Sequence, residues 1–230
     1  MQCIEQCYNI IFGTTFGYID AMAEIAEEYP DVIFLHCSGY LNNDTNFANY
    51  FGKMYQPRYL SGLAAGAMTD SNKIGYVAAF PIPEVIRGIN AFAAGVNEVN
   101  PDATVEVVWT FTWFGPEAET QAANALLETG ADVLAQHQDS TATGLAAEAA
   151  GAKWISYNTA YGKDSAPEAF VTAPVWDWGP YYVDIVESII DGTFSTESYW
   201  GGMETGLVSL YDLSSDVPSD IATLIGEKTD

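Results

Sequence analysis

The sequence is poor in basic residues, with seven lysines and arginines against 31 aspartates and glutamates and a formal net charge of −24 over 230 residues. A surface this negative repels phosphate backbones and anionic lipid headgroups, which argues against nucleic acids and membrane surfaces as partners. Long hydrophobic runs are also missing, since none approaches the ~20 residues of a membrane-spanning helix. No charged and then apolar leader opens the sequence. Hydrophobic residues nevertheless make up 49%, which is typical of a folded chain.

Cysteine and histidine are equally sparse. The three cysteines, Cys3, Cys7 and Cys37, form an odd and scattered set, which argues against a disulfide framework and predicts small buried thiols. With only two histidines besides, the sequence offers no convincing set of metal ligands. We therefore expect neither a metal nor another cofactor.

The motifs of common hydrolases and nucleotide-binding enzymes are absent from the sequence. It contains no G-x-S-x-G elbow, no Walker loop and no H-E-x-x-H. Asp139 lies close to His137 and could suggest acid–base chemistry, but no nucleophile accompanies the pair. We therefore expect no catalytic residues and no enzyme, and keep a hydrolase or lyase acting on nucleosides only as a third hypothesis.

Short apolar runs alternate with segments of helical periodicity along most of the chain. Such alternation predicts an α/β fold, in which a mostly parallel sheet has helices on both sides. His36 lies inside one predicted strand and is expected to be core. The predicted strands are 9–14, 31–38, 73–80, 104–110, 131–137 and 153–158, and the predicted helices are 18–29, 55–68, one opening at Pro83, 115–130, one ending at Gly151, and 179–190.

The residues that follow the predicted strands indicate what kind of ligand the chain could bind. In open α/β sheets, ligands bind beyond the carboxyl ends of the strands. Lysine, arginine and glycine-rich turns, which a phosphorylated ligand would need, are missing there. A flat neutral ligand with several hydrogen-bonding edges suits the lining better. The side chains in question are mostly aromatic, amide or hydroxyl groups and include Phe16, Gly17, Phe80, Trp113, His137, Asp139 and Asn158.

Most of these residues also have a purely structural interpretation. Asp139 could cap the following helix, and His137 could be a hydrogen-bonded structural histidine. Trp113 follows its strand in a polar loop, which favours a site over the core. Arg87 lies in the first turn of a helix, where a cation is unfavourable, so it could serve a ligand or pair with Glu84 three residues earlier.

Four longer stretches carry a resemblance to a known family. They read TTFGYIDAM, PRYLSGLAAGAM, KIGYVAAFPIPEVIRGINAFAAGV and GADVLAQHQDS, and they occur in this order along nearly the whole chain. The sequence resembles the basic-membrane-protein (BMP, PnrA-like) substrate-binding proteins of ABC importers. The segments WGPYY and YWGGM make it most similar to a branch that binds purine bases or related compounds.

The resemblance implies a type I periplasmic-binding-protein fold of two lobes, with the ligand cleft and hinge between them. Residues 1–45 and 161–199 would form lobe 1, and residues 46–160 and 200–230 would form lobe 2. Family members begin with an export signal, often of the lipoprotein type, and with an initial strand–helix unit. Neither is recognisable in this sequence. The resemblance therefore implies that the full-length protein lies in the periplasm or on the extracellular face of the membrane, as a lipoprotein.

Site residues follow from the resemblance only where the motifs match. Phe16 of TTFGY would lie on a cleft loop of the first lobe, and Trp113 would stack on the base. Asn158 of SYNTAY stands where nucleoside-binding members commonly have an aspartate that holds the ribose, so its amide favours a free base. Asp139 could accept hydrogen bonds from a ring N–H or an exocyclic amine.

The stretch APVWDWGPYY gathers four large aromatic residues around a Gly-Pro pair. Gly179 and Pro180 are expected to open the last helix. In an extended chain Trp176 and Trp178 would point to the same side. We expect one of them to line the pocket and the other to pack in the hinge, with Trp176 favoured for the pocket.

Together these features predict a receptor that binds a purine-type base, such as adenine, and delivers it to the permease subunits of an ABC importer. The alternatives are a nucleoside ligand and a ligand-sensing regulatory module of the same fold. We expect a monomer that binds no nucleic acid.

Overall fold

The computed structural model describes residues 1–229, which form two compact units. The first unit comprises residues 1–53 and 178–207, and the second comprises residues 54–177 and those from 208 onward. These boundaries differ from the expected ones, because residues 161–177 belong to the second unit and residues 46–53 and 200–207 to the first. The residues that change units contain strands that the hydrophobic periodicity of the sequence does not reveal, including one at 47–52.

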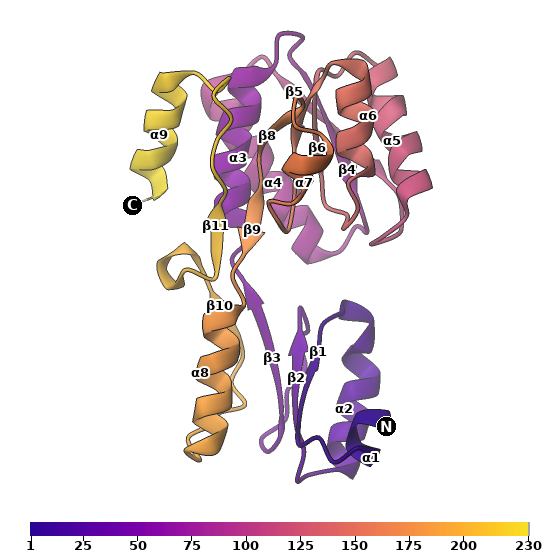
Figure 1. Ribbon diagram of the computed structural model, residues 1–230, viewed down its shortest axis with the longest axis vertical. Coiled ribbons are helices and arrows are strands. Elements are labelled where there is room, and N and C mark those ends of the chain that lie inside the picture. Colours follow the sequence, from indigo (N-terminus) through magenta and orange to yellow (C-terminus); the bar gives the residue numbers. More distant parts are fainter. Residues whose placement is uncertain (230) are drawn as a thin grey trace. The chain divides into compact units, whose positions relative to one another are not determined.

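The first unit contains a four-stranded parallel sheet in the order β1-β2-β3-β10. Helices α2 and α8 lie on opposite sides of this sheet (Figure 1). The strands are β1 (Ile10–Gly13), β2 (Ile33–Cys37), β3 (Phe47–Gly52) and β10 (Tyr199–Gly201). The helices are α1 (Gln2–Glu5), η1 (Phe16–Tyr18), α2 (Ile19–Glu28), α8 (Gly179–Ile190) and η2 (Met203–Thr205).

Aromatic rings form much of the core of the first unit. Tyr50 of β3 is fully buried and stacks on Tyr181 with ring centroids 4.8 Å apart. Its hydroxyl group lies 3.2 Å from that of Tyr182, and Phe12 contacts the Tyr182 ring at 4.7 Å. The α8 residues expected to face the core, Tyr182, Ile185, Val186 and Ile189, are half-buried, and the buried residue of this helix is their neighbour Tyr181.

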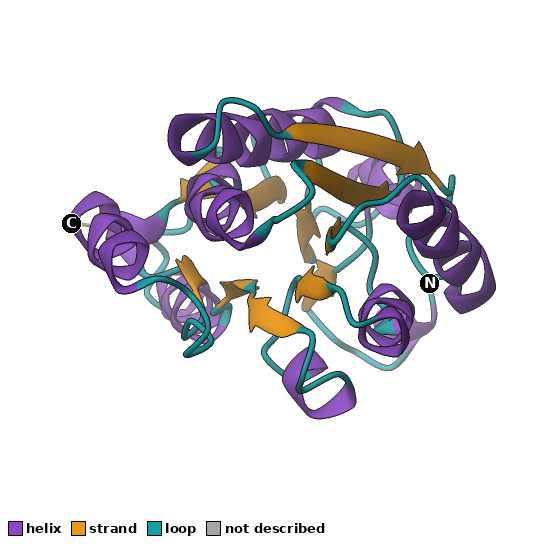
Figure 2. Ribbon diagram, turned by 90° about the horizontal axis from the view of Figure 1, so that it is seen from above, coloured by secondary structure: helices purple, strands orange, loops and turns teal. Residues whose placement is uncertain are grey.

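The second unit contains a five-stranded parallel sheet in the order β5-β4-β6-β7-β8. Helices α3 and α4 cover one face of the sheet, and α5 and α6 cover the other (Figures 1 and 2). The strands are β4 (Lys73–Ala78), β5 (Thr104–Trp109), β6 (Val133–Gln136), β7 (Lys153–Ile155) and β8 (Phe170–Thr172), and β9 (Pro174–Trp176) pairs antiparallel with β11 (Val208–Leu210). The helices are α3 (Tyr55–Met68), α4 (Pro83–Val99), α5 (Pro116–Glu128), α6 (Ala142–Ala150), α7 (Gly162–Ser165) and α9 (Ser219–Thr229).

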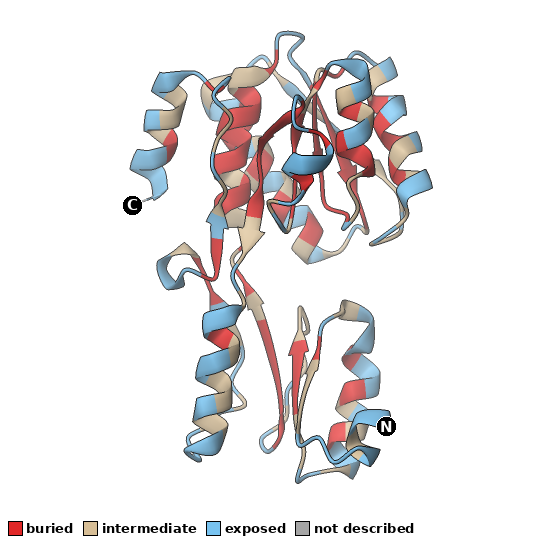
Figure 3. Ribbon diagram, in the orientation of Figure 1, coloured by how far each residue is buried: buried red, intermediate tan, exposed pale blue. Residues whose placement is uncertain are grey.

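Two glycines let helices α3 and α4 approach closely. A Cβ atom on Gly62 would collide with the carbonyl oxygen of Phe92, and one on Gly95 would collide with that of Tyr59. Strands β4 and β6 behind these helices are almost entirely buried, as the red colouring in Figure 3 shows. The second unit thus has a dense core that fixes the strand ends.

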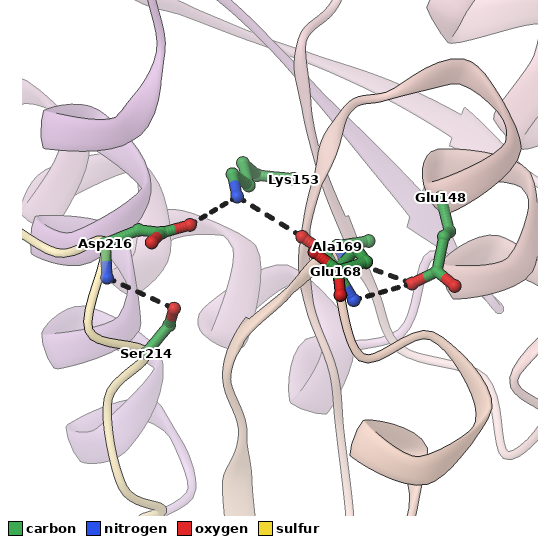
Figure 4. Close-up of polar contacts among 6 residues, drawn as sticks. All are labelled: Glu148, Lys153, Glu168, Ala169, Ser214 and Asp216. Atoms are coloured by element: carbon green, nitrogen blue, oxygen red, sulfur yellow. Dashed lines mark hydrogen bonds and ion pairs between the residues drawn. The ribbon is translucent and has the colours of Figure 1, made fainter.

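Polar contacts attach the segment after β11 to this core (Figure 4). Lys153 of β7 forms an ion pair of 2.6 Å with Asp216 and donates to the carbonyl oxygen of Glu168 at 3.2 Å. Glu148 of α6 accepts hydrogen bonds from the amides of Glu168 and Ala169 at 2.8 and 3.2 Å. These contacts join the segment after β11 and the loop before β8 to α6 and to the amino-terminal end of β7.

The structure confirms the predicted α/β fold and each of the six predicted strands, with ends shifted by a few residues. The prediction of buried thiols is wrong, because Cys3 and Cys7 are exposed and Cys37 is half-buried. The first two lie in and beside the short helix α1, which has no buried residue. Within residues 1–229, no helix is both long and apolar enough to cross a membrane.

Candidate functional site

The candidate site lies at the carboxyl ends of the parallel strands of the second unit. Because parallel strands end at one edge of a sheet, the loops after β4, β5, β6 and β7 meet there. These loops carry Phe80, Trp113, His137, Asp139 and Asn158, all of which the sequence pattern singled out.

Aromatic side chains form a continuous row along this edge. The ring of Trp113 lies 5.1 Å from that of Phe80 and 5.7 Å from that of His137, measured between centroids. His137 in turn lies 4.8 Å from Tyr157, whose other neighbour is the guanidinium group of Arg58, 3.9 Å from the ring centroid. Trp113 and Phe80 are half-buried, so the row is partly open to solvent at this end.

Buried hydrogen bonds fix the two loops that carry Trp113 and Asp139. The amide of Asp139 donates to the carbonyl oxygen of Trp113 at 3.0 Å. Glu119 is fully buried in α5, where it accepts a hydrogen bond from the amide of Gly115 at 2.8 Å and one from the hydroxyl of Ser140. One carboxylate therefore connects the loop after β5 to the loop after β6.

Asn158 holds Asp139 and Trp176 together. Its side-chain amide donates to Asp139 Oδ1 at 2.5 Å, and its Oδ1 accepts from the indole N–H of Trp176 at 3.0 Å. Its backbone is left-handed, with φ 66°, a conformation that asparagine tolerates better than most residues. Ser140, rather than Asp139, accepts from the amide of Ala142 at the start of α6.

Electrostatics make His137 a neutral ring. Burial lowers its pKa well below the usual value, and the nearby Arg58 cation lowers it further. Within residues 1–229, neither His137 Nδ1 nor any nitrogen of the Arg58 guanidinium has a hydrogen-bond partner, although all of these atoms are buried. A buried polar group without a hydrogen-bond partner lowers the stability of a protein. These atoms therefore mark a region in which the described residues leave hydrogen-bonding groups unused.

Two carboxyl groups close to His137 have raised pKa values. Burial raises the pKa of Glu84 to about 7, against the opposing effect of Arg87. Burial also raises the pKa of Asp139, while the hydrogen bond from Asn158 opposes that shift. The edge therefore carries two carboxyls that are less acidic than usual and a histidine that stays uncharged.

Sequence reasoning missed Arg58 and Glu84 as members of this cluster. Arg58 was detectable, because it lies among the buried residues of helix 55–68, where an arginine is out of place without a polar partner. Glu84 was considered only as a partner for Arg87. Arg87 itself is exposed, and its guanidinium carbon lies 5.8 Å from the centroid of the Tyr55 ring.

Three predicted site residues, Phe16, Gly17 and Trp178, belong to the first unit. Trp178 stacks on Tyr182 at 6.1 Å and contacts Tyr50 edge-on at 5.4 Å. The expectation for Trp176 and Trp178 assumed an extended chain, but the chain is not extended at Trp178, which has helical dihedral angles at the N-cap of α8. The extended strand ends at Trp176.

His36 is buried inside β2, which confirms its assignment to the core. Its Nε2 lies 2.8 Å from the carbonyl oxygen of Thr15, so the histidine fastens the loop that leads to Phe16. In the described part of the chain, no group of three or more metal-ligating side chains could hold a metal ion.

The family of PnrA-like ABC transporter substrate-binding proteins matches residues 2–225. A putative ABC transporter glucose-binding protein of Haloferax volcanii is 46% identical over 213 residues, which cover 93% of this chain and 54% of the relative. A purine-binding protein of Brucella abortus is 40% identical over 224 residues, covering 95% of this chain and 62% of the relative. The chain thus spans less than two thirds of the length of either relative.

Solved structures of low sequence identity share the fold. A solute-binding protein of an ABC transporter system from Aeropyrum pernix has a TM-score of 0.87 at 16% identity, covering 99% of this chain and 76% of its own. A transcriptional activator of the comK gene from Bacillus halodurans has a TM-score of 0.86 at 22% identity, and the match covers 98% of this chain and 78% of the activator.

Proposed function

The chain belongs to the PnrA-like family of ABC transporter substrate-binding proteins, and from this premise we propose that it binds a purine-type base for import. The family consists of solute-binding proteins rather than enzymes, and it acts outside the cytoplasm. The observation that carries the proposal is the juxtaposition of the Trp113 ring with the hydrogen-bonded pair Asp139 and Asn158 at one sheet edge.

A purine suits these groups chemically. Stacking one base on an aromatic ring contributes about 1–3 kcal/mol. Asp139 can accept from a ring N–H or an amino group, and Trp113 offers the flat face. A micromolar dissociation constant corresponds to about −8 kcal/mol, so a second stacking face and several satisfied hydrogen bonds must add to this contribution.

The polar pair also favours a base over a nucleoside. The oxygen of Asn158 is engaged by the indole of Trp176, and its amide group is engaged by Asp139. One of its two N–H donors and one of its two acceptor sites are thus used within the protein, which leaves half of its hydrogen-bonding capacity for a ribose. A nucleoside ligand is the alternative within the same proposal, and one relative from Lactococcus lactis, 24% identical, is named as a nucleoside-binding protein.

A sugar is the second candidate ligand, because the relative from Haloferax volcanii is named as a putative glucose-binding protein. An aromatic ring beside a carboxylate and an amide is also compatible with a sugar ring and its hydroxyl groups. Isothermal titration calorimetry with adenine, guanine, hypoxanthine, adenosine, inosine and glucose separates these possibilities. We expect binding of at least one free base. Heat from nucleosides or glucose alone would refute the free-base proposal.

The proposed partners are the permease and ATPase subunits of an importer, with the receptor acting as a monomer anchored by a lipid in its full-length form. A regulatory role is the alternative, and several proteins of this fold are named as transcription regulators. Neighbouring genes for a permease and an ATPase would support import, whereas fusion to a helix-turn-helix domain would support regulation. Size-exclusion chromatography tests the monomeric state.

A further inference from the structure

Glu84 occupies a central position among the groups of the candidate site. It is the second residue of α4, which follows β4 and the loop of Phe80. Its side chain is only 19% exposed, and its Oε1 lies 3.9 Å from His137 Nε2. That separation is too long for a hydrogen bond, so the imidazole does not saturate the carboxyl group.

Charged and titratable groups face Glu84 from several elements. Arg87, one turn further along α4, favours the ionised carboxylate, whereas Asp139 after β6 disfavours it. Tyr157 after β7 is also within electrostatic reach of Glu84. His137 is neutral, and Arg58 of α3 acts on His137 and Tyr157. Burial outweighs the effect of Arg87, so the pKa of Glu84 rises to about 7.

Two observations independent of the carboxyl groups point to a ligand beside them. His137 is only 5% exposed, and its Nδ1 has no hydrogen-bond partner in the described part of the chain. Arg58 is fully buried, and none of its guanidinium nitrogens has a partner there either. Buried polar groups are normally paired, so a polar ligand at this edge would relieve an otherwise unfavourable arrangement.

The protonation state of a carboxyl group decides which ligand edge it can read. A neutral carboxylic acid presents an O–H donor beside a C=O acceptor, whereas a carboxylate presents acceptors only. The neutral acid therefore matches an edge with a donor next to an acceptor, such as the amino group and ring nitrogen of a 6-aminopurine. The carboxylate instead matches two adjacent donors, such as the N1–H and amino group of guanine.

We propose that Glu84 contacts the ligand as a neutral acid and selects a purine edge on which an N–H donor lies next to an acceptor nitrogen. This inference rests on the proposed purine-binding function and specifies the residue and protonation state that determine its selectivity. The O–H of Glu84 donates to the ring nitrogen, and its C=O accepts from the amino group. No covalent bond changes.

Calorimetric titration of the whole chain with adenine between pH 5.5 and 8.5 tests the inference. Binding that requires the protonated form weakens as pH rises through the pKa of Glu84, about 7, so we expect roughly a tenfold loss of affinity from pH 6 to pH 8. Glu84→Gln should retain adenine binding and lose the pH dependence, because an amide also presents a donor beside an acceptor. Glu84→Ala should weaken adenine binding at pH 6 by tenfold or more.

Glu117→Gln is the matched control, because Glu117 is also the second residue of a helix that begins with proline but is exposed. It should reproduce the wild-type pH profile. Asp139→Asn should keep a pH dependence, because Glu84 remains, but the profile should move to lower pH, because Asp139 no longer disfavours the ionised form of Glu84.

Several results would overturn the inference. They are adenine binding that is independent of pH in the wild type, a Glu84→Gln variant as weak as Glu84→Ala, and a pH dependence that disappears in Asp139→Asn alone. If the wild type preferred guanine and bound it more strongly at high pH, the form of Glu84 that contacts the ligand would be the carboxylate instead. Absence of heat with every purine at every pH is a distinct result that refutes the proposed function itself.

Discussion

Substitutions at Asn158 can separate the backbone and side-chain contributions of this residue. Its side chain makes two hydrogen bonds, to Asp139 and from Trp176, and its φ of 66° is left-handed. Glycine removes both bonds but adopts this backbone without strain. Alanine removes both bonds and adds the strain. Aspartate keeps an acceptor for Trp176 but places a second carboxylate against Asp139.

The expected magnitudes follow from these contacts. Each hydrogen bond contributes about 1 kcal/mol net, and a left-handed alanine costs about 1–2 kcal/mol more than glycine. We therefore expect Asn158→Gly to lower the free energy of unfolding by about 2 kcal/mol and Asn158→Ala by about 3 kcal/mol. Asn158→Asp should be destabilised at neutral pH and recover stability as acid protonates the carboxyl pair, whose mutual repulsion raises its pKa values.

Urea denaturation followed by far-UV circular dichroism provides the measurement, with an unchanged m-value as the condition for comparing variants. Adenine titrations of the same variants show whether the pair of Asp139 and Trp176 must be held for binding. Equal stability of Asn158→Gly and Asn158→Ala would refute the role of the left-handed backbone. Stability within about 0.5 kcal/mol of the wild type for all three variants would refute the role of the hydrogen bonds as well.

Three further predictions concern the site loops and the core beneath them. Trp113→Ala should reduce purine affinity at least tenfold, about 1.4 kcal/mol, with little change in urea midpoint, and unaltered calorimetric affinity would show that the ring only packs. Glu119→Ala should lower the free energy of unfolding by about 2 kcal/mol. Glu119→Gln should lower it by less, because the amide can still accept a hydrogen bond from one loop and donate one to the other. Equal thermal midpoints of the two variants would contradict this expectation. Gly144→Ala should cost about 2 kcal/mol in urea denaturation, since a Cβ there would enter the ring of Trp154. Gly226→Ala, whose Cβ would meet nothing within 4 Å, is its control and should be neutral or stabilising.

Sequence periodicity predicted most of the longer elements, whose hydrophobic patterning is strong, but it missed strand β3 and helix α9. Helix α8 begins and ends at the predicted residues, and β4 and β5 are close to theirs. Strand β3 and the three-residue strands β8, β9, β10 and β11 escaped prediction. Strands β9 and β10 pair with partners that are distant in sequence. Those omissions also shifted the expected boundaries of the two units.

The strand-end rule found Trp113, His137 and Asp139 because they follow strands that sequence periodicity defines. Asn158 follows a strand defined in the same way, and the structure joins it to Asp139. Arg58 was missed because its importance depends on burial without a partner, which requires the packed neighbours to be known. No sequence pattern indicates the tertiary contact by which Glu119 joins two loops.

The pairing of β10 with β3 has a consequence for the order of events during synthesis on the ribosome. The sheet of the second unit is complete once residue 172 has emerged, whereas the first unit waits for residues 199–201 to take their place beside β3. The sheet that contains β1, β2 and β3 is therefore completed after the sheet whose strands follow them in the chain. Until then β3 keeps one edge unpaired, and the nascent chain is exposed to pairing with other strands during this interval.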